Sequence, residues 1–187
     1  MTRMLIIGPP GAGKGTQAVR ISEKLGVPAI STGDIFRANI KGRTPLGDEA
    51  RSYIDAGDLV PDSVTNRMVR ARLAETDTAD GFLLDGYPRN AAQVEELDAI
   101  LAGPGRDLDA VLKLTADNDE LVQRLLGRAR KEGRTDDTEA VIRHRLDVYD
   151  AETAVVVDLY DERGIVREVD GLGTVDEVTE RIMAALS

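Results

Sequence analysis

The feature that most constrains the fold is a glycine-rich segment, Gly8–Thr16, which directly follows the apolar run Met4–Ile7. Glycines let backbone N–H groups turn toward one anion, the helix that follows presents the positive end of its dipole, and Lys14 adds a cation. The pattern predicts a buried strand, a phosphate-binding loop and a helix, with a nucleotide polyphosphate as the ligand. Gly15 stands where Ser or Thr usually follows the lysine, so we do not expect a direct bond between Thr16 and a metal ion.

Composition limits the class of protein. The 187 residues are 42% hydrophobic, which suits a single domain with a sizeable core. No run approaches the ~20 apolar residues of a membrane span, and the apolar run before the loop is too short for a signal peptide. We therefore expect a cytoplasmic protein without a membrane partner. The lack of cysteine excludes disulfides and cysteine-ligated zinc, and the net charge of −10 disfavours broad binding to nucleic acid.

Short apolar runs alternate with helical periods along the chain. Strands are expected near residues 3–7, 28–31, 81–85, 109–114 and 165–169. This alternation predicts an α/β fold, in which a five-stranded parallel sheet lies between two layers of helices in a three-layer α/β/α arrangement. Ligands of such sheets bind beyond the carboxyl ends of the strands, where Gly8, Thr32, Asp85 and Asp170 fall.

The span 34–75 is longer than one crossover between parallel strands needs. Helices are expected over about Asp34–Ile40, Leu46–Ala56, Pro61–Ala74 and, at the end of the chain, 175–186. An insertion at the mouth of the sheet can act as a moving subdomain. A second polar break at 129–137 is short, so a lid formed there would be small.

The segment after the third strand holds candidate ligand residues. Asp85 ends that strand, and a carboxylate beside a phosphate loop can hold Mg²⁺ through water, although an Asp-Gly turn is the alternative. Arg89 can hold a phosphate with two hydrogen bonds, and Gln93, four residues later, can contact a base. An ordinary surface position is the alternative for both residues, and it is a stronger alternative for Gln93 than for Arg89.

Helical arginines supply further candidates. Asp34 is expected to cap a helix, and Arg37 in its first turn opposes the helix dipole, which hints at an anionic partner. Arg124 and Arg128 share one helix face, for which a solvated charged face is the alternative. Arg145 falls on the apolar stripe of its helix, so we expect it to be paired with a carboxylate or used by a ligand.

Together these motifs resemble the adenylate kinases, a family of nucleoside monophosphate kinases, over nearly the whole chain. The resemblance depends on Gly8–Thr16 with Gln17, Ser31–Asp34 with Arg37, Asp85–Arg89 with Gln93, Arg124 with Arg128, Arg134 with Asp136 and Asp137, and Arg145. It implies one P-loop kinase domain with a core of residues 1–30, 61–127 and 138–187, an AMP-binding insertion of 31–60 and a short lid of 128–137. It also implies the reaction MgATP + AMP ⇌ 2 ADP in adenine nucleotide homeostasis, Mg²⁺ bound with ATP, no zinc, and a monomer.

The same resemblance implies the role of each residue. The catalytic residues would be Lys14, Arg89, Arg128, Arg134 and Arg145. The ATP site would comprise Gly11, Ala12, Gly13, Lys14, Gly15, Thr16, Arg124, Arg128 and Gly173. The AMP site would comprise Thr32, Gly33, Arg37, Gly57, Leu59, Val60, Gly86, Arg89, Gln93, Arg134 and Arg145. Asp85 would order the water molecules of Mg²⁺, and the Tyr87–Pro88 bond would be cis.

Two alternative functions stay open. A UMP/CMP kinase of the same fold would also have a short lid, and Asn90 after Pro-Arg fits it. Thr32, where those enzymes usually carry alanine, and Gln93, which is placed to read adenine, favour AMP. A nucleotide-binding switch without phosphoryl transfer would not need so many arginines. His144, the only histidine, is expected on an exposed helix face, and we assign it no role.

Overall fold

The computed structural model describes residues 2–103, 107–133 and 138–187. A five-stranded parallel sheet lies at its centre, with the strand order β2-β3-β1-β4-β5. The strands are β1 (Thr2–Ile7), β2 (Ala29–Ser31), β3 (Gly81–Asp85), β4 (Ala110–Thr115) and β5 (Val166–Asp170). Every boundary lies within one residue of the sequence prediction. The inner strands β1, β3 and β4 are largely apolar runs, whereas the edge strand β5 (Val166–Asp170) combines apolar and charged residues.

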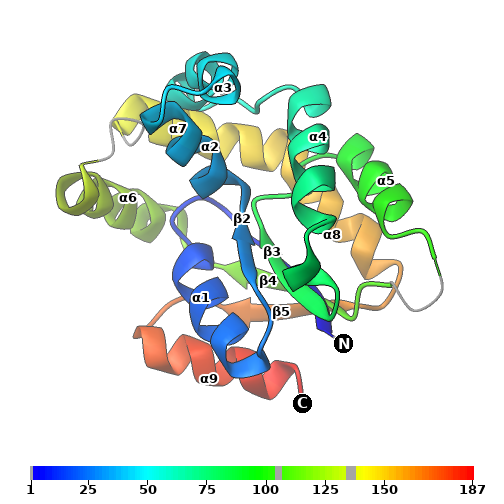
Figure 1. The fold of residues 1–187 in the computed structure, drawn as a ribbon. Coiled ribbons are helices and arrows are strands. Elements are labelled where there is room, and N and C mark those ends of the chain that lie inside the picture. The colour runs from blue at the N-terminus through cyan, green and yellow to red at the C-terminus, as the bar shows by residue number, and fades with distance from the viewer. Residues whose placement is uncertain (1, 104–106, 134–137) are drawn as a thin grey trace.

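Helices cover both faces of the sheet (Figure 1). They are α1 (Lys14–Leu25), α2 (Thr32–Lys41), α3 (Pro45–Ala56), α4 (Asp62–Leu73), α5 (Ala91–Ile100), α6 (Asn118–Glu132), α7 (Glu139–Val148), α8 (Ala154–Asp161) and α9 (Val175–Ala185). A short 3-10 helix η1 (Thr76–Thr78) precedes β3, and a π-helical turn η2 (Tyr149–Thr153) joins α7 to α8. Among the described residues, no helix is both long and apolar enough to cross a lipid bilayer. The predicted three-layer α/β/α fold is confirmed.

Two apolar clusters, one on each face of the sheet, form the core. On one face Ile6 of β1 shares a cluster with Ile21 of α1 and Ile182 of α9. On the other face Leu5 belongs to a cluster with Leu97 of α5. All of these side chains are at most 1% exposed, and each contributes roughly 1.5–3 kcal/mol by burial. Burial on both faces explains why the central strands are continuous apolar runs rather than alternating ones.

Helices α2 and α3 form the expected insertion beyond the carboxyl end of β2 (Figure 1). The predicted N-cap of α2 was wrong: Ser31, not Asp34, caps the helix, because the Ser31 hydroxyl accepts a hydrogen bond from Asp34 N at 3.3 Å. Asp34 lies in the first turn and forms an ion pair of 2.6 Å with Arg37, which lies one turn further on. A carboxylate in the first turn interacts favourably with the helix dipole and partly neutralises the charge of Arg37. Because α2 begins at Thr32, Arg37 lies beyond its first turn and does not oppose the dipole as predicted.

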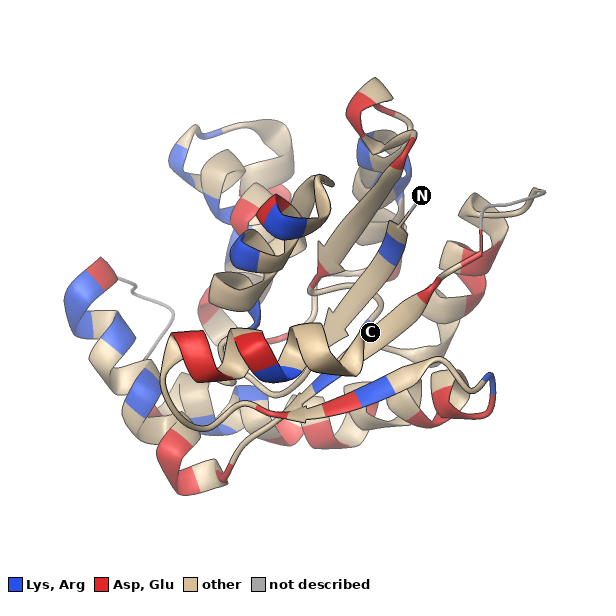
Figure 2. Ribbon diagram, turned by 90° about the horizontal axis from the view of Figure 1, so that it is seen from below, with Lys and Arg blue, Asp and Glu red and all other residues tan. Residues whose placement is uncertain are grey.

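The charge on α6 follows its dipole. Asp119 and Glu120 lie in its first turn, and Arg130 and Lys131 lie in its last. Figure 2 shows this helix acidic at its start and basic toward its end. The basic end extends the helix that also carries Arg124 and Arg128, so positive charge accumulates on one side of the cleft described next.

Candidate active site

A loop of residues 8–13 joins β1 to α1 and forms the floor of the site. Gly13 is the N-cap of α1, with φ of 94°, and no side chain caps the helix. The first backbone N–H groups of α1 are therefore available to an anion. Lys14 Nζ donates to the carbonyl oxygen of Pro9 at 3.1 Å, across the loop. Gly11 also requires glycine, because its φ is 84° and a Cβ there would lie 2.9 Å from Leu125 Cγ.

The loop opens into one continuous cleft of about 850 Å³. Its walls come from α1, α2, α6, α7, the end of β3 and the loop after β5. The cleft is lined by all the predicted ATP residues, namely Gly11, Ala12, Gly13, Lys14, Gly15, Thr16, Arg124, Arg128 and Gly173. It is also lined by Asp85 and by Gly33, Arg37, Gly86, Arg89 and Arg145 from the predicted AMP set. Residues from segments far apart in the sequence thus face one space, as the positions of strand ends in a parallel sheet require.

Three charged groups at the base of the cleft influence one another. Burial lowers the pKa of Lys14 to about 8, and the negative charge of Asp85 partly opposes this effect. Burial raises the pKa of the Asp85 carboxyl, while Lys14 and Arg89 act in the opposite direction. Burial also lowers the pKa of the Arg89 guanidinium. Half-buried cations of this kind carry a desolvation cost that Asp85 offsets only in part, and a polyphosphate would supply further negative charge.

Asp85 is positioned to face the phosphate loop. It is 8% exposed and ends β3, and a Cβ on Gly15 would lie 3.8 Å from Asp85 Oδ2. Within the described ranges, no group of three or more His, Cys, Asp or Glu residues could hold a metal ion. A carboxylate such as that of Asp85 suits Mg²⁺, and the described residues offer no cluster of ligands that would hold a metal ion by themselves.

A second, smaller pocket lies between α2, α4 and the segment after β3. It is lined by Thr32, Gly33, Phe36, Ile54, Asp58, Leu59, Val60, Thr65, Gly86, Arg89 and Gln93. The Thr32 hydroxyl donates to the carbonyl oxygen of Gly86 at 3.0 Å. Gly57 lies just beyond, where a Cβ would come within 2.8 Å of Arg145 Cγ. The predicted AMP residues within the described ranges are therefore neighbours.

Arg89 connects this pocket to the cleft, and three hydrogen bonds fix its position. Its Nε donates to the Gly86 carbonyl at 2.8 Å, and its backbone N–H donates to Gln93 Oε1 at 2.8 Å. Its carbonyl accepts from the Thr153 hydroxyl, also at 2.8 Å. Arg89 lines both cavities.

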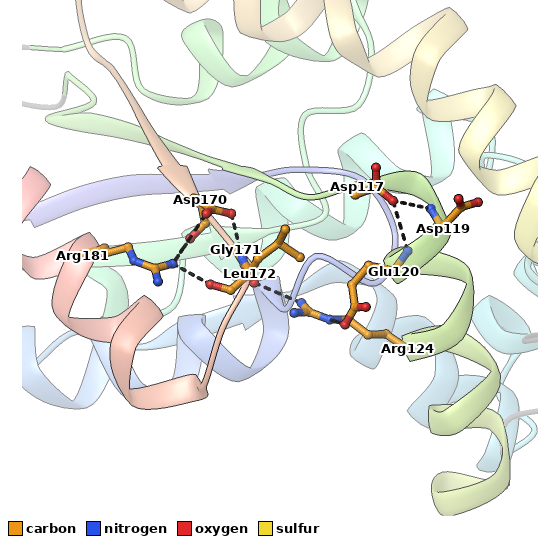
Figure 3. Close-up of polar contacts among 8 residues, drawn as sticks. All are labelled: Asp117, Asp119, Glu120, Arg124, Asp170, Gly171, Leu172 and Arg181. Carbon is orange, nitrogen blue, oxygen red and sulfur yellow. Dashed lines mark hydrogen bonds and ion pairs between the residues drawn. The ribbon is translucent and has the colours of Figure 1, made fainter.

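At the opposite end of the cleft, two arginines hold the loop that follows β5 (Figure 3). Arg124 Nη1 donates to the Gly171 carbonyl at 3.1 Å and Nε donates to Glu120 at 3.1 Å. Arg181 Nη1 donates to the carbonyl oxygens of Asp170 at 2.9 Å and Leu172 at 2.6 Å. The loop that contains Gly173 is thus held from α6 on one side and from α9 on the other.

Comparison with known proteins is consistent with this geometry. The profile of the family described as "Adenylate kinase" matches residues 6–165. The chain is 76% identical to the adenylate kinase of Kocuria rhizophila over 186 residues, which covers 100% of this chain and 99% of that protein. It is 69% identical to the adenylate kinase of Pseudarthrobacter chlorophenolicus, over 100% of this chain and 97% of that protein. The chain belongs to the adenylate kinase family.

Membership of the adenylate kinase family confirms the interpretation reached from the motifs and does not favour a UMP/CMP kinase. The structure also accounts for Asn90, the residue that left the pyrimidine alternative open. Its side-chain oxygen accepts from Gln93 N at 2.9 Å and caps α5, and its Nδ2 donates to Asp62 at 3.0 Å. A structural role therefore explains this residue.

The remaining predicted positions of this adenylate kinase family member differ in how they stand in the structure. Arg134 lies outside the described residues. Arg145 lines the cleft, as predicted, but is half-buried rather than enclosed. The cis bond expected between Tyr87 and Pro88 is present. His144 lies on an exposed face as expected, but its Nε2 lies 2.6 Å from Asp58 Oδ1 and links α7 to the end of the insertion.

Several residues that build the site in this family member were missed from the sequence. Asp62, Thr153 and Arg181 hold Gln93, Arg89 and the loop after β5, respectively. These residues share no motif with the residues that they position. Asp62 is 31 residues from Gln93, Thr153 is 64 residues from Arg89, and Arg181 is up to 11 residues from its partners in the loop. Asp62, next to a proline at the start of a helix, carries the only local signal, that of a helix start.

Proposed function

We propose that this chain transfers the γ-phosphoryl group of MgATP to the phosphate of AMP, and runs the reverse reaction from two ADP. The observation that carries the proposal is that the phosphate loop and Arg89 line one continuous cleft, with Arg37, Arg124, Arg128 and Arg145 on its walls. A protein that only binds ATP has no use for this number of cations around the terminal phosphate. Two polyanions that must approach each other do need them.

The phosphate loop is proposed to bind ATP. The free N–H groups at the start of α1 and the Lys14 ammonium would hold the β- and γ-phosphates. Arg124 and the loop with Gly173 would hold the adenine of ATP, and Arg128 would lie along the phosphates. Binding a polyphosphate adds negative charge next to Lys14, which raises the pKa of its ammonium group back toward the normal range.

The smaller pocket is proposed to bind AMP. Arg37 and Arg89 would hold its phosphate, Thr32, Gly86 and Gln93 would face its base, and Gly57, Leu59 and Val60 would line the walls. Arg89 is positioned by Gly86, Gln93 and Thr153 before any ligand arrives. This preorganisation lowers the entropic cost of bringing the acceptor phosphate into line with the γ-phosphate.

The chemistry requires charge stabilisation rather than proton transfer. The acceptor oxygen of AMP is already ionised at neutral pH, so no general base has to remove a proton from it. Lys14, Arg89, Arg128, Arg134 and Arg145 would neutralise the charge that develops on the phosphoryl group in transfer. Removing one such donor typically lowers turnover by on the order of 10²–10³. When bound with ATP, Mg²⁺ supplies further neutralisation of the phosphate charge, and Asp85 would hold its water molecules.

Exclusion of water is the second requirement, because water would otherwise compete with AMP for the phosphoryl group. We propose that the insertion of residues 31–60 and the lid of 128–137 close over the two nucleotides. We also propose that the chain acts as a monomer, as the family resemblance suggests, and that it works in the cytoplasm.

A coupled assay of ADP formation from MgATP tests the function, with AMP, UMP, CMP and GMP compared as acceptors. We expect a strong preference for AMP. A preference for UMP or CMP would retain the phosphoryl transfer but contradict the assignment of Thr32 and Gln93. ATP binding without transfer to any acceptor would support a binding protein instead.

A further inference from the structure

The side chain of Gln93 is held in one orientation at the wall of the smaller pocket. It is 2% exposed. Its Oε1 accepts from the backbone N–H of Arg89 at 2.8 Å, and its Nε2 donates to Asp62 Oδ1 at 2.8 Å. Arg89 lies in the segment after β3, and Asp62 is the first residue of α4. Two separate elements therefore hydrogen-bond to the same amide.

The chemistry of these two partners prevents the amide from turning over. A carboxylate only accepts hydrogen bonds, and a backbone N–H only donates. A flipped Gln93 amide would place its oxygen against the Asp62 carboxylate and its NH₂ group against the Arg89 N–H. Both hydrogen bonds would then be replaced by repulsive contacts in a buried position, where unpaired polar groups are costly.

Asp62 is itself held in place. The Asn90 Nδ2 donates to the same carboxylate oxygen at 3.0 Å, while Asn90 Oδ1 accepts from Gln93 N and caps α5. Asp62, Asn90 and Gln93 thus form a closed triad that joins the starts of α4 and α5. The arrangement leaves the Gln93 amide with one N–H and one oxygen lone pair for a ligand.

The remaining donor and acceptor of Gln93 distinguish between two classes of purine. Adenine offers an acceptor at N1 and a donor at its 6-amino group. Hypoxanthine and guanine offer the opposite pattern, a donor at N1–H and an acceptor at O6, and would require the flipped amide. We propose that Asp62 is a positioning residue that sets acceptor selectivity, because by locking the Gln93 amide it admits 6-aminopurine monophosphates and rejects 6-oxopurine monophosphates. This inference depends on the proposed AMP site.

The test compares kcat/KM for AMP with kcat/KM for IMP, in wild type and in Asp62→Asn. An asparagine side chain has both a donor and an acceptor, so it can pair with either orientation of Gln93. Arg89 N–H continues to favour the original orientation, so the selectivity falls without vanishing. We expect the AMP:IMP ratio to drop roughly tenfold, with the KM for ATP unchanged, because a charged hydrogen bond that enforced one orientation is lost.

Asn90→Ser is the matched control. Serine also caps helices well, so α5 keeps its N-cap, while the second donor to the Asp62 carboxylate is lost. The AMP:IMP ratio should stay within about twofold of wild type, because the bond between Gln93 and Asp62 remains. A thermal melt of each variant reports stability separately, and Asp62→Ser replaces Asp62→Asn should the latter fail to fold.

The outcomes separate this inference from the proposed function. An unchanged AMP:IMP ratio in the Asp62 variants, together with a changed ratio in Gln93→Ala, would overturn the role of Asp62 and leave the AMP site intact. An equal fall in the ratio in Asn90→Ser would also overturn it, since general loosening of the triad would then explain the effect. Failure of the wild type to use AMP would overturn the proposed function and this inference with it.

Discussion

Replacing Lys14 by methionine should remove the activity and yet stabilise the ligand-free protein. Burial lowers the pKa of the Lys14 ammonium from 10.5 to about 8, and this fall corresponds to a cost of roughly 3 kcal/mol for keeping the folded protein charged at neutral pH. The favourable effect of Asp85 on the ammonium is already contained in this shift. Screening by solvent reduces the gain from removing the charge, because Lys14 is only half-buried and keeps some contact with solvent. We therefore expect Lys14→Met to raise the free energy of unfolding by about 1–2 kcal/mol at pH 7.

The pH dependence of this gain follows from the same shift. Below pH 8 the Lys14 ammonium is charged in both folded and unfolded states, so the full free-energy cost of holding its charge in the folded protein is present. Between pH 8 and 10.5 the folded protein holds neutral Lys14 while the unfolded chain holds the charged form, and the cost declines. Above pH 10.5 Lys14 is neutral in both states, and the difference between variant and wild type should vanish.

Urea unfolding followed by circular dichroism, at pH 7 and at steps up to pH 10.5, measures this difference directly. In a thermal melt at pH 7, the melting temperature of Lys14→Met should lie about 2–8 °C above that of wild type. Lys24→Met is the matched control, because Lys24 lies exposed on the same helix, and its effect should stay within about 0.5 kcal/mol. A Lys14→Met protein no more stable than wild type at pH 7, or a gain that persists at pH 10.5, would refute the reasoning. Near-normal turnover in this variant would refute the role of the loop.

Three further predictions test the two binding sites and the loop. Arg89→Ala should raise the KM for AMP about 10- to 100-fold, because a charged contact to the AMP phosphate is lost, while the KM for ATP stays within about twofold. Steady-state kinetics with each substrate varied in turn measures both constants, and an equal rise in the two KM values would contradict this prediction. Arg181→Met removes two hydrogen bonds to the loop after β5 and should raise the KM for ATP roughly five- to tenfold with the KM for AMP unchanged; a larger effect on AMP would show that the loop does not serve the ATP site. Gly11→Ala should lower the melting temperature by about 4–8 °C, more than Gly26→Ala does. Both glycines have positive φ, but only Gly11 lacks space for a Cβ. Equal losses in the two variants would mean that the backbone conformation, rather than the close contact, limits position 11.

Much of the fold could be predicted because its signals are local. The inner strands are short, largely apolar runs, and the phosphate loop is a continuous segment whose glycines have one structural explanation. The N-cap of α2 shows the limit of such reasoning. Ser31 and Asp34 are both good capping residues within one turn of each other, and the choice depends on where β2 ends against β3. That pairing is not local, so the sequence pattern could not decide between them.

The polar partners of the site residues were beyond sequence reasoning for a related physical reason. A hydrogen bond needs two groups within about 3 Å of each other and correctly oriented, and sequence spacing says nothing about such distances between different elements. Asp62 reaches Gln93 from another helix, and Thr153 reaches Arg89 from the π-helical turn. The side chain of His144 likewise has a partner, Asp58, that only the packing of α7 against the insertion supplies.

The sequence by itself therefore determined the architecture and the phosphate loop, because these follow from periodicity and from a contiguous motif, whereas the roles of the other candidate site residues came from the family resemblance. The tertiary structure alone decided how those residues are oriented: which way the Gln93 amide faces, what holds Arg89, and how burial lowers the pKa of Lys14. Orientation and burial are properties of groups brought together from distant parts of the chain. They exist only once the sheet and its two layers of helices have packed.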